Sequence, residues 1–461
     1  MVNILYKEYI LENNLTVVYE RLNHLKSVSF GVWIGAGARY ETRRNNGISH
    51  FIEHMVFKGT EKRTAKDIAC EIDRIGGEIN AFTGKDCTCY YTKTLYSDLE
   101  TAVEILSDML LNPVFNLEHM ETEKKVVMEE IGMYEDDPEE LVHDLLTEEM
   151  WNGVPLGYPI LGTAESLERI VSDDLIEYMS TFYIPDNCVI SVVGNFDEEH
   201  LIELINKYFG KWKSLGYCNL SNERPLFRTH FLFKKKETEQ THLCIGFRGL
   251  PMGDNRTYAL MVLNNIIGGG MSSRLFQRIR EELGLVYSIY SFPTSFRDCG
   301  MFTIYVAANP DKVNKVIECI GSEINNLISQ GITESELLRS KNQLKGNYCL
   351  SLDSTSGRMT SIGKSKIITG TVTYPEEILK QIDNIRISEV LDLIDWIFKE
   401  GETGVVILGD ELSPLQKEII KKIYFDGLTE VEIAKDKKVT RQYIHNIKAK
   451  SLKRLRNDFL Q

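Results

Sequence analysis

Two histidines and a glutamate in the segment His50–His54 have the types and spacing of a group that binds a metal ion and moves a proton. His50, Glu53 and His54 stand at positions i, i+3 and i+4, so a helix carries all three on one face. The rest of the predicted helix, residues 48–58, is apolar nearly all the way round, which indicates burial. Buried imidazole and carboxylate groups need partners, and a divalent metal ion would supply one. The alternative is a pair of core histidines that hydrogen-bond to their neighbours.

A further ligand must come from another part of the chain, because zinc in a hydrolase takes three protein ligands and keeps one position open for water. The predicted helix over residues 117–134 offers Glu123 and Glu130, which lie two turns apart on one stripe. The expected buried side of this helix is marked by Val126, Val127 and Ile131. The remaining glutamates fit a solvated face; they are Glu118, Glu121 and Glu129.

The motif places its glutamate directly before the second histidine, which is the order of the inverted zincins. Glu130 follows His54 by 76 residues, and Glu123 lies seven residues before Glu130. With these spacings the chain resembles the pitrilysin/insulinase family of zinc peptidases, which includes the mitochondrial processing peptidases and their bacterial relatives. The resemblance implies that His50, His54 and Glu130 bind one Zn²⁺ per chain. It also implies that Glu53 activates the zinc-bound water, whose pKa falls towards about 7, and that Glu123 supports a ligand.

The second half of the chain carries another match to this family, around the glycine-rich residues 268–270. In the family this region supplies an arginine and a tyrosine, which correspond to Arg280 and Tyr287. The resemblance implies that both reach the substrate beside the metal, where a guanidinium and a phenol hydroxyl suit a developing oxyanion. Taken alone, the glycine run fits a flexible turn, because it lacks the spacing of a phosphate-binding loop.

A fourth stretch, Asn80, Ala81, Phe82 and Thr83, resembles the family's substrate-binding strand. In relatives this strand pairs with extended substrate through backbone hydrogen bonds, which tolerate many sequences. The alternative is an ordinary edge strand.

Residues 411–461 fall outside this resemblance, which covers about residues 1–410. They predict two helices, a turn and a basic helix, and they resemble the final helix-turn-helix of bacterial sigma factors. By analogy Arg441, Gln442 and His445 would face DNA bases. The tail holds 12 Lys and Arg against 7 Asp and Glu, whereas the rest of the chain holds 41 against 60. The alternative is a helical appendage with a solvated basic face.

Strand-like and helix-like patterns alternate in both halves of the chain, with strands expected at 27–34 and 88–95 and one helix at 164–182. We expect an α+β fold with two similar domains, each a mainly antiparallel sheet packed with helices, plus a small all-α helix-turn-helix tail. The predicted divisions are a catalytic zinc-binding domain at 1–213, a turn-rich linker at 214–226, a second peptidase-family domain at 227–410 and the tail at 411–461.

Composition excludes several classes of protein. A chain with 43% hydrophobic and 26% charged residues is near globular averages, and no run of 18 apolar residues predicts a membrane span or a membrane partner. The nine cysteines are scattered, with no CxxC pair, so neither a zinc ribbon nor a disulfide framework is expected. Free thiols and the lack of a secretory pattern at the start favour the cytoplasm.

The leading interpretation is a zinc metalloendopeptidase that hydrolyses unfolded polypeptides or short peptides. The family closes its active site between two halves, each made of two such domains, so we expect a homodimer. One alternative is a metal-loaded but non-proteolytic peptide-binding partner subunit, which has no need of the Glu53 that this chain retains. Another is a DNA-binding regulator in which the peptidase body acts as a sensor.

Overall fold

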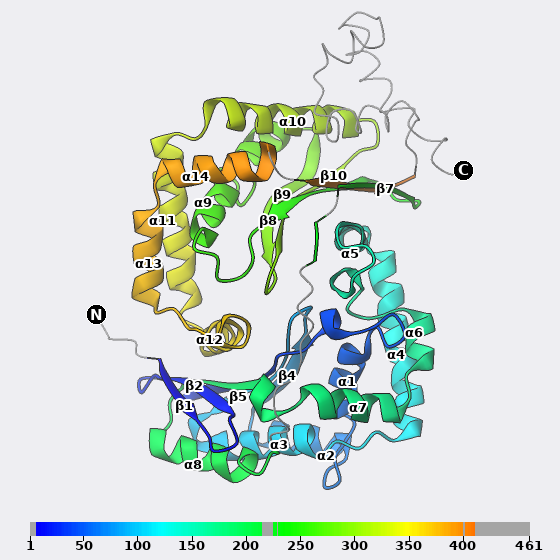
Figure 1. Ribbon diagram of the computed structural model, residues 1–461, viewed down its shortest axis with the longest axis vertical. Coiled ribbons are helices and arrows are strands. Elements are labelled where there is room, and N and C mark those ends of the chain that lie inside the picture. Colours follow the sequence, from blue (N-terminus) through cyan, green and yellow to red (C-terminus); the bar gives the residue numbers. More distant parts are fainter. Residues whose placement is uncertain (1–5, 214–224, 228, 400–401, 411–461) are drawn as a thin grey trace, which may run out of the picture. The chain divides into compact units, whose positions relative to one another are not determined.

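The computed structural model describes residues 6–213, 225–227, 229–399 and 402–410 (Figure 1). The chain folds into two compact units, called unit 1 and unit 2 below. Unit 1 takes its described residues from the ranges 1–133, 153–223 and 345–381. Unit 2 takes its described residues from the ranges 134–152, 224–344 and 382–461. Each unit thus contains a segment from the other half of the sequence.

The predicted domains, 1–213 and 227–410, are each continuous in sequence and contain no exchanged segment. Their boundaries stay predictions. The predicted helix-turn-helix tail at 411–461, with Arg441, Gln442 and His445, lies outside the described residues. Nearly all of the predicted linker at 214–226 lies outside them as well.

Unit 1 is built on a six-stranded sheet. In sheet order its strands are β1 (Lys7–Ile10), β2 (Thr16–Arg21), β6 (Cys188–Gly194), β3 (Ser27–Ile34), β5 (Thr88–Leu95) and β4 (Glu78–Thr83). Neighbouring strands are antiparallel except β2 and β6, which are parallel. The strands predicted at 27–34 and 88–95 are confirmed as β3 and β5.

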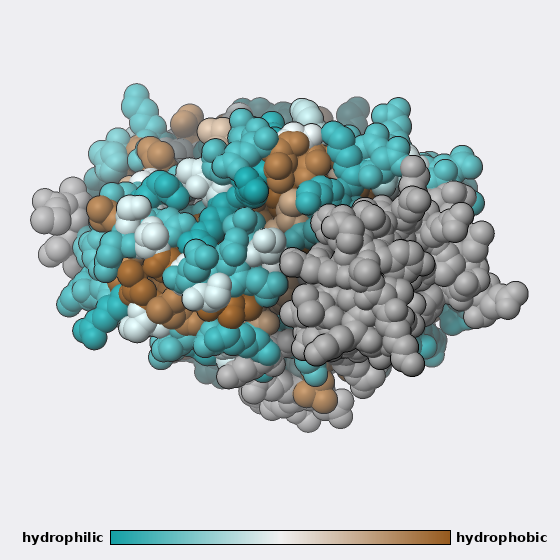
Figure 2. Space-filling view, turned by 90° about the horizontal axis from the view of Figure 1, so that it is seen from above, coloured by the Kyte–Doolittle hydropathy of each residue, from teal (hydrophilic) through white to brown (hydrophobic). Residues whose placement is uncertain are grey.

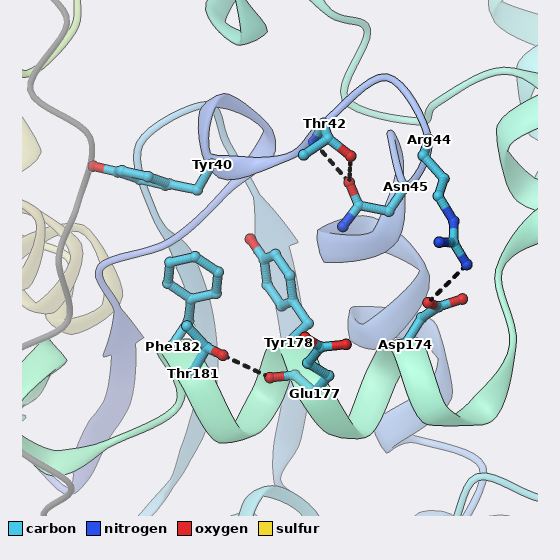
Figure 3. A pocket seen from close by; sticks show the side chains of 9 residues that line it. All are labelled: Tyr40, Thr42, Arg44, Asn45, Asp174, Glu177, Tyr178, Thr181 and Phe182. Carbon is cyan, nitrogen blue, oxygen red and sulfur yellow. Dashed lines mark hydrogen bonds and ion pairs between the residues drawn. The ribbon is translucent and has the colours of Figure 1, made fainter.

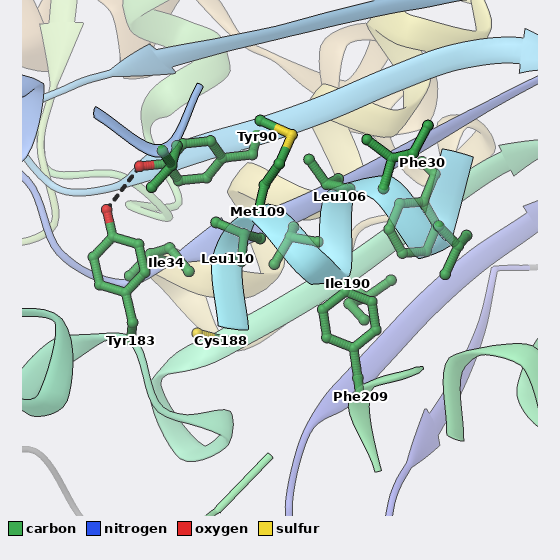
Figure 4. Close-up of a cluster of buried hydrophobic side chains, with 14 of the residues drawn as sticks. Phe30, Ile34, Tyr90, Leu106, Met109, Leu110, Tyr183, Cys188, Ile190 and Phe209 are labelled. Atoms are coloured by element: carbon green, nitrogen blue, oxygen red, sulfur yellow. Dashed lines mark hydrogen bonds between the residues drawn. The ribbon is translucent and has the colours of Figure 1, made fainter. Parts of the chain in front are cut away.

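One face of this sheet packs on helices from the first half of the chain. The helices of this half in unit 1 are α1 (Ile48–Val56), α2 (Ala65–Arg74), α3 (Leu99–Leu111), α4 (Leu117–Asp136), α6 (Ala164–Arg169), α7 (Ser172–Phe182) and α8 (Glu198–Phe209). Figure 4 shows part of the core, in which Phe30 and Ile190 from the strands meet Leu106 and Met109 of α3. The single helix predicted at 164–182 is wrong: it breaks into α6 and α7, because Val171 is extended and its N–H donates to the Asp174 carboxylate.

Helix α12 (Thr355–Thr369), from the second half of the sequence, covers the other face of this sheet. The fit depends on small residues, since a Cβ on Gly31 would come within 2.4 Å of the Met359 sulfur and one on Gly363 within 2.0 Å of Trp33 Nε1. Strand β3 is buried on both faces for this reason.

Unit 2 repeats the plan with a five-stranded sheet. In sheet order its strands are β7 (His230–Lys235), β11 (Thr403–Gly409), β8 (Thr241–Gly249), β10 (Gly300–Ala308) and β9 (Val286–Ser295). Neighbours are antiparallel except β7 and β11, which are parallel. The apolar core of this unit includes side chains from helices α9 (Thr257–Ile267), α10 (Val313–Gln330) and α14 (Ile387–Ile394). Helices α11 (Glu334–Ser351) and α13 (Pro375–Asn384) complete the second half.

Helix α5 (Pro138–Met150), from the first half of the sequence, contacts strands β7, β8 and β11 of unit 2. A chain of polar contacts joins it to the sheet: the Cys244 thiol lies 3.4 Å from His143 Nδ1, His143 Nε2 lies 3.1 Å from the Tyr290 hydroxyl, and that hydroxyl donates to Glu139 Oε1 at 2.6 Å. Burial lowers the pKa of His143 and raises the pKa of Cys244, so both groups are held neutral.

The predicted α+β fold class, with two similar, mainly antiparallel sheet domains, is confirmed.

Within the described ranges, none of the helices has the length and apolar character needed to cross a membrane. On the face drawn in Figure 2, hydrophobic residues form small groups between hydrophilic ones.

Candidate metal centre

Helix α1 is fixed at its start by a buried carboxylate. The two oxygens of Glu41 accept hydrogen bonds from the backbone N–H groups of Gly47 and Ser49, at 2.7 and 2.9 Å, and from the Asn46 side chain at 2.8 Å. An acceptor here satisfies donors that the first turn of a helix leaves free. Gly47 has φ 91°, and a Cβ there would lie 2.7 Å from the Leu161 carbonyl oxygen. The backbone conformation at the start of α1 therefore requires a glycine at position 47.

The buried side of α1 is apolar and fully covered, with Phe51, Ile52 and Met55 at its centre. The side chains of His50 and His54 are 12% and 17% exposed, and their ring centroids lie 4.5 Å apart. The helix thus presents both imidazoles together, as the i, i+4 spacing predicts.

Helix α4 brings the carboxylates. Met120 and Val127 are buried in the core, and Glu123 and Glu130 lie on the same stripe. The glutamates expected on a solvated face are exposed; they are Glu118, Glu121 and Glu129. The expected burial of Val126 is wrong, since its side chain is 42% exposed: it lies about 100° round the helix from Val127.

The three predicted ligands converge. Glu130 Oε2 lies 3.9 Å from His50 Nε2 and 3.6 Å from His54 Nε2, and one ligand atom from each residue lies within 4.8 Å of the other two. Burial and the neighbouring His54 lower the pKa of His50 to about 3, so its ring is neutral with a nitrogen lone pair to offer. Two imidazole nitrogens and a carboxylate oxygen suit a zinc ion with an open fourth position.

Glu123 connects the cluster to a lysine. Its Oε1 lies 2.9 Å from His54 Nδ1, and its Oε2 lies 2.6 Å from Lys58 Nζ. A carboxylate beside Nδ1 keeps the proton of the neutral ring on that nitrogen and leaves Nε2 free as a ligand atom. Sequence reasoning missed Lys58, which lies just beyond the end of α1 and whose partner Glu123 is on another helix.

Glu53 has a hydroxyl partner. Thr83 Oγ1, at the end of β4, donates a hydrogen bond to the Glu53 carboxylate. Burial raises the pKa of Glu53, and the Thr83 hydrogen bond and His54 oppose that rise. A carboxylate with a raised pKa accepts and releases protons more readily near neutral pH.

The predicted substrate strand is an edge strand. Strand β4 ends the sheet order and pairs with β5. Asn80 Oδ1 accepts the Ala81 N–H at 2.8 Å, and the Phe82 ring packs edge-on against Trp33. Because Thr83 donates a hydrogen bond to Glu53, the structure brings this strand to the cluster of His50, His54 and Glu130, called the metal cluster below.

Arg280 and Tyr287 lie together in unit 2, whereas the metal cluster belongs to unit 1. Arg280 lies on the helical turn η5 (Phe276–Glu282) and Tyr287 on β9. The guanidinium carbon of Arg280 lies 4.6 Å from the centroid of the Phe276 ring and 5.6 Å from that of Tyr287. The Tyr287 side chain is exposed.

A polar pocket of about 270 Å³ lies beside α7 in unit 1 (Figure 3). Arg44 faces Asp174 across it at 3.7 Å. The Tyr178 hydroxyl, in its wall, lies 2.8 Å from Ser49 Oγ of α1. None of His50, His54 and Glu130 lines the pocket, and the Tyr178–Ser49 hydrogen bond links its wall to α1.

Three family models match the chain. Residues 16–164 match the insulinase family of peptidases, M16, and residues 169–344 match the domain described as the M16 inactive domain. Residues 410–457 match region 4 of the sigma-70 factors. The metal cluster falls in the first match, and Arg280 and Tyr287 fall in the second.

Curated relatives have similar length. The Bacillus subtilis protein YmxG, named an uncharacterized zinc protease, is 45% identical over 394 residues, which cover 86% of this chain and 96% of the relative. A Streptomyces coelicolor protein, also named an uncharacterized zinc protease, is 36% identical over 389 residues, covering 82% and 84%.

Solved structures share the fold. A protease from Helicobacter pylori superposes with a TM-score of 0.82 at 21% identity, covering 88% of this chain and 99% of that one. A peptidase M16 inactive domain from Pseudomonas fluorescens gives 0.81 at 18% identity, covering 88% and 98%. With the family models and the curated relatives, these matches confirm the resemblance seen in the motifs: the chain belongs to the insulinase family of peptidases, M16.

Proposed function

We propose that this protein is a zinc-dependent metalloendopeptidase that hydrolyses unfolded polypeptides or short peptides. The observation that carries the proposal is the convergence of ligand atoms from His50, His54 and Glu130 within 4.8 Å of one another, with the Glu53 carboxylate on the same helix face. Three protein ligands with a nearby carboxylate are typical of a catalytic rather than a structural zinc site. The zinc protease names of the relatives support it.

The residues divide the reaction between them. A zinc ion held by His50, His54 and Glu130 would supply a Lewis acid, which would make water easier to deprotonate and polarise the scissile carbonyl. Glu53 takes the proton of the attacking water and returns it to the leaving amine. Thr83 holds the Glu53 carboxylate through its hydroxyl. The edge of β4 would bind the peptide as an added strand, which requires an extended chain and so favours unfolded substrates.

The test compares a substitution of the proposed base, Glu53, with substitutions of the proposed ligands, His50 and Glu130. We expect one zinc per chain and loss of peptidase activity on chelation. Glu53→Gln should retain the metal and lose turnover, because it removes the base and leaves the ligands. His50→Ala and Glu130→Ala should lose the metal. The readouts are zinc content and digestion of a peptide library followed by mass spectrometry.

Equal zinc loss in all these variants would contradict the division into base and ligands. Zinc binding without cleavage by the wild-type chain would favour the non-proteolytic partner subunit instead. Retention of Glu53, held by Thr83, argues against that alternative, since peptide binding alone requires neither.

We also propose a homodimer in which Arg280 and Tyr287 of one chain approach the zinc site of the other, where their side chains would be suitable hydrogen-bond donors to a developing oxyanion. Their pairing in one patch of unit 2 supports a joint role. We propose the cytoplasm as the compartment, which the absence of disulfides among the described cysteines supports.

A second function, DNA binding by residues 411–461, is supported by the match of residues 410–457 to sigma-70 region 4. Arg441, Gln442 and His445 would then contact bases. DNA footprinting of the full chain and of a chain lacking residues 411–461 tests this. Protection that persists without the tail, or is absent from both chains, would eliminate it.

A further inference from the structure

We propose that Lys58 is a positioning residue of the metal centre: its ammonium group holds Glu123 in the orientation that fixes the His54 ring as a ligand. This proposal rests on the proposed function of His50, His54 and Glu130 as a zinc site. In the described part of the chain Lys58 forms no hydrogen bond or ion pair with any of the three ligands, so its action passes through Glu123.

The first argument is the use of the two Glu123 oxygens. The Glu123 side chain is only 6% exposed. Among the described residues each oxygen has one charged or polar partner: His54 Nδ1 at Oε1, 2.9 Å away, and Lys58 Nζ at Oε2, 2.6 Å away. A buried carboxylate without a cation is costly, and the ammonium group supplies that cation. With Oε2 held by Lys58, Oε1 stays directed at the imidazole.

The second argument is the fixed position of the Lys58 backbone. The Lys58 N–H donates to the Met55 carbonyl oxygen at 3.0 Å, in the turn that ends α1. Gly59 follows with φ 135°, where a Cβ would lie 2.9 Å from the Arg63 carbonyl oxygen. Thr60 then donates its hydroxyl proton to Asp108 at 2.7 Å. The Lys58 side chain therefore extends from a backbone that is already held in place, so holding its ammonium group costs side-chain freedom only.

The consequence concerns the tautomer of His54. If Lys58 is replaced by an uncharged residue, Glu123 keeps a buried charge with one partner and gains by turning towards water. The ring is then free to carry its proton at Nε2, the atom that faces Glu130, and in that form it cannot bind a metal there. Groups that orient a metal ligand typically contribute about 10- to 100-fold to metal affinity.

The alternative is that the Lys58–Glu123 pair only fastens α1 to α4. Both views predict some loss of stability when Lys58 is replaced, so stability alone does not distinguish them. Only the positioning role predicts a change in zinc affinity that depends on Glu123.

The experiment measures the zinc dissociation constant of the full chain by competition with a chromogenic chelator. Lys58→Met should weaken zinc binding roughly tenfold, at the lower end of the range for groups that support a ligand. Lys58→Gln provides a second neutral variant, and Lys58→Arg, which keeps the charge, should recover most of the affinity. Lys124→Met is the matched control: this lysine lies on α4 beside Glu123, but its ammonium group contacts Glu121 and the Glu168 carbonyl oxygen.

A double-mutant cycle tests the route through Glu123. In a Glu123→Gln background, Lys58→Met should cause no further loss of zinc affinity, because the group on which it acts is gone. The proposal is overturned if the two losses multiply, if Lys58→Met leaves the affinity unchanged, or if Lys124→Met weakens it equally.

The failure of this proposal and that of the proposed function give different results. A wild-type chain that binds zinc and cleaves no peptide refutes the peptidase, while the affinity comparison still decides the role of Lys58. A wild-type peptidase whose zinc affinity is insensitive to Lys58→Met refutes only the positioning role. A wild-type chain that binds no zinc refutes both.

Discussion

Glu53 and Glu123 differ in their partners, and that difference supports the separate tasks proposed for them. Glu53 receives one hydroxyl hydrogen bond, from Thr83, and its burial raises its pKa. Glu123 bridges an imidazole and an ammonium group. A carboxylate in the first environment can exchange a proton during a reaction, and one in the second is held in place. The side-chain partners therefore agree with the different tasks that the family resemblance implies for the two glutamates.

At the residue scale, we predict that Thr83→Val lowers kcat about tenfold and leaves zinc affinity unchanged. The substitution keeps the shape of the side chain and removes the hydrogen bond to Glu53, and such bonds to charged groups contribute about 1.5–3 kcal/mol. Steady-state kinetics with a fluorogenic peptide and a zinc titration would measure both. Thr88→Val is the control, since Thr88 faces Thr83 across the strand pair and its hydroxyl bonds the Ala36 carbonyl oxygen. A matching loss of kcat in the control would exclude a specific role for Thr83.

At the element scale, three pieces of chain place the metal cluster. Helix α1 begins where Glu41 accepts its first N–H groups, and α4 directs its Glu123–Glu130 stripe towards the two histidines. Strand β4 delivers the Thr83 hydroxyl. These elements belong to unit 1, whose sheet is covered on its second face by α12. The stability of the site thus depends on a helix far from it in sequence.

We predict that Gly363→Ala destabilises the protein by about 1–3 kcal/mol, the usual cost of overpacking a well-packed contact. The added Cβ would lie 2.0 Å from Trp33 Nε1, so α12 must move away from the sheet. Urea unfolding followed by circular dichroism measures the change. Gly346→Ala is the matched control, because this glycine is also helical and a Cβ there meets nothing within 4 Å. That variant should be neutral or slightly stabilised, and equal losses in the two would contradict the packing explanation.

At the scale of the whole molecule, both units follow one plan. Each sheet has one face on its apolar core and the other against a single helix, α12 in unit 1 and α5 in unit 2, that comes from the other half of the sequence. Small residues at the contacts permit this: Gly31 and Gly363 in unit 1, and Gly246 against Leu146 in unit 2. The exchange makes each unit dependent on both halves of the chain, so we do not expect either half to fold alone.

The proposed homodimer predicts complementation between inactive chains. Glu53→Gln lacks the base in unit 1, and Tyr287→Phe lacks the donor in unit 2. A mixture of the two should recover part of the wild-type activity, because half of the sites in a heterodimer combine an intact base with an intact tyrosine. Peptidase assays of the mixture measure this, with each variant alone as its control. Absence of recovery, once exchange of subunits has been shown by mass spectrometry, would rule out sites shared between chains.

The sequence by itself determined the parts that depend on local periodicity. The helical spacing of His50, Glu53 and His54, the stripe shared by Glu123 and Glu130, and strands β3 and β5 all follow from patterns that repeat over a few residues. The α+β class follows from the order of such elements. The family resemblance supplied the choice of Glu130 as the third ligand.

Only the tertiary structure decided which distant groups meet. The Lys58–Glu123 pair, the Thr83–Glu53 hydrogen bond and the Glu41 contacts with α1 join segments whose own patterns contain no sign of the partner. The exchange of α5 and α12 is of the same kind, since an apolar helix face specifies that it must be buried and not which sheet will bury it. The hydrophobic effect is non-directional, so many apolar surfaces could bury such a helix face. The packing of the complete chain decides which surface does so.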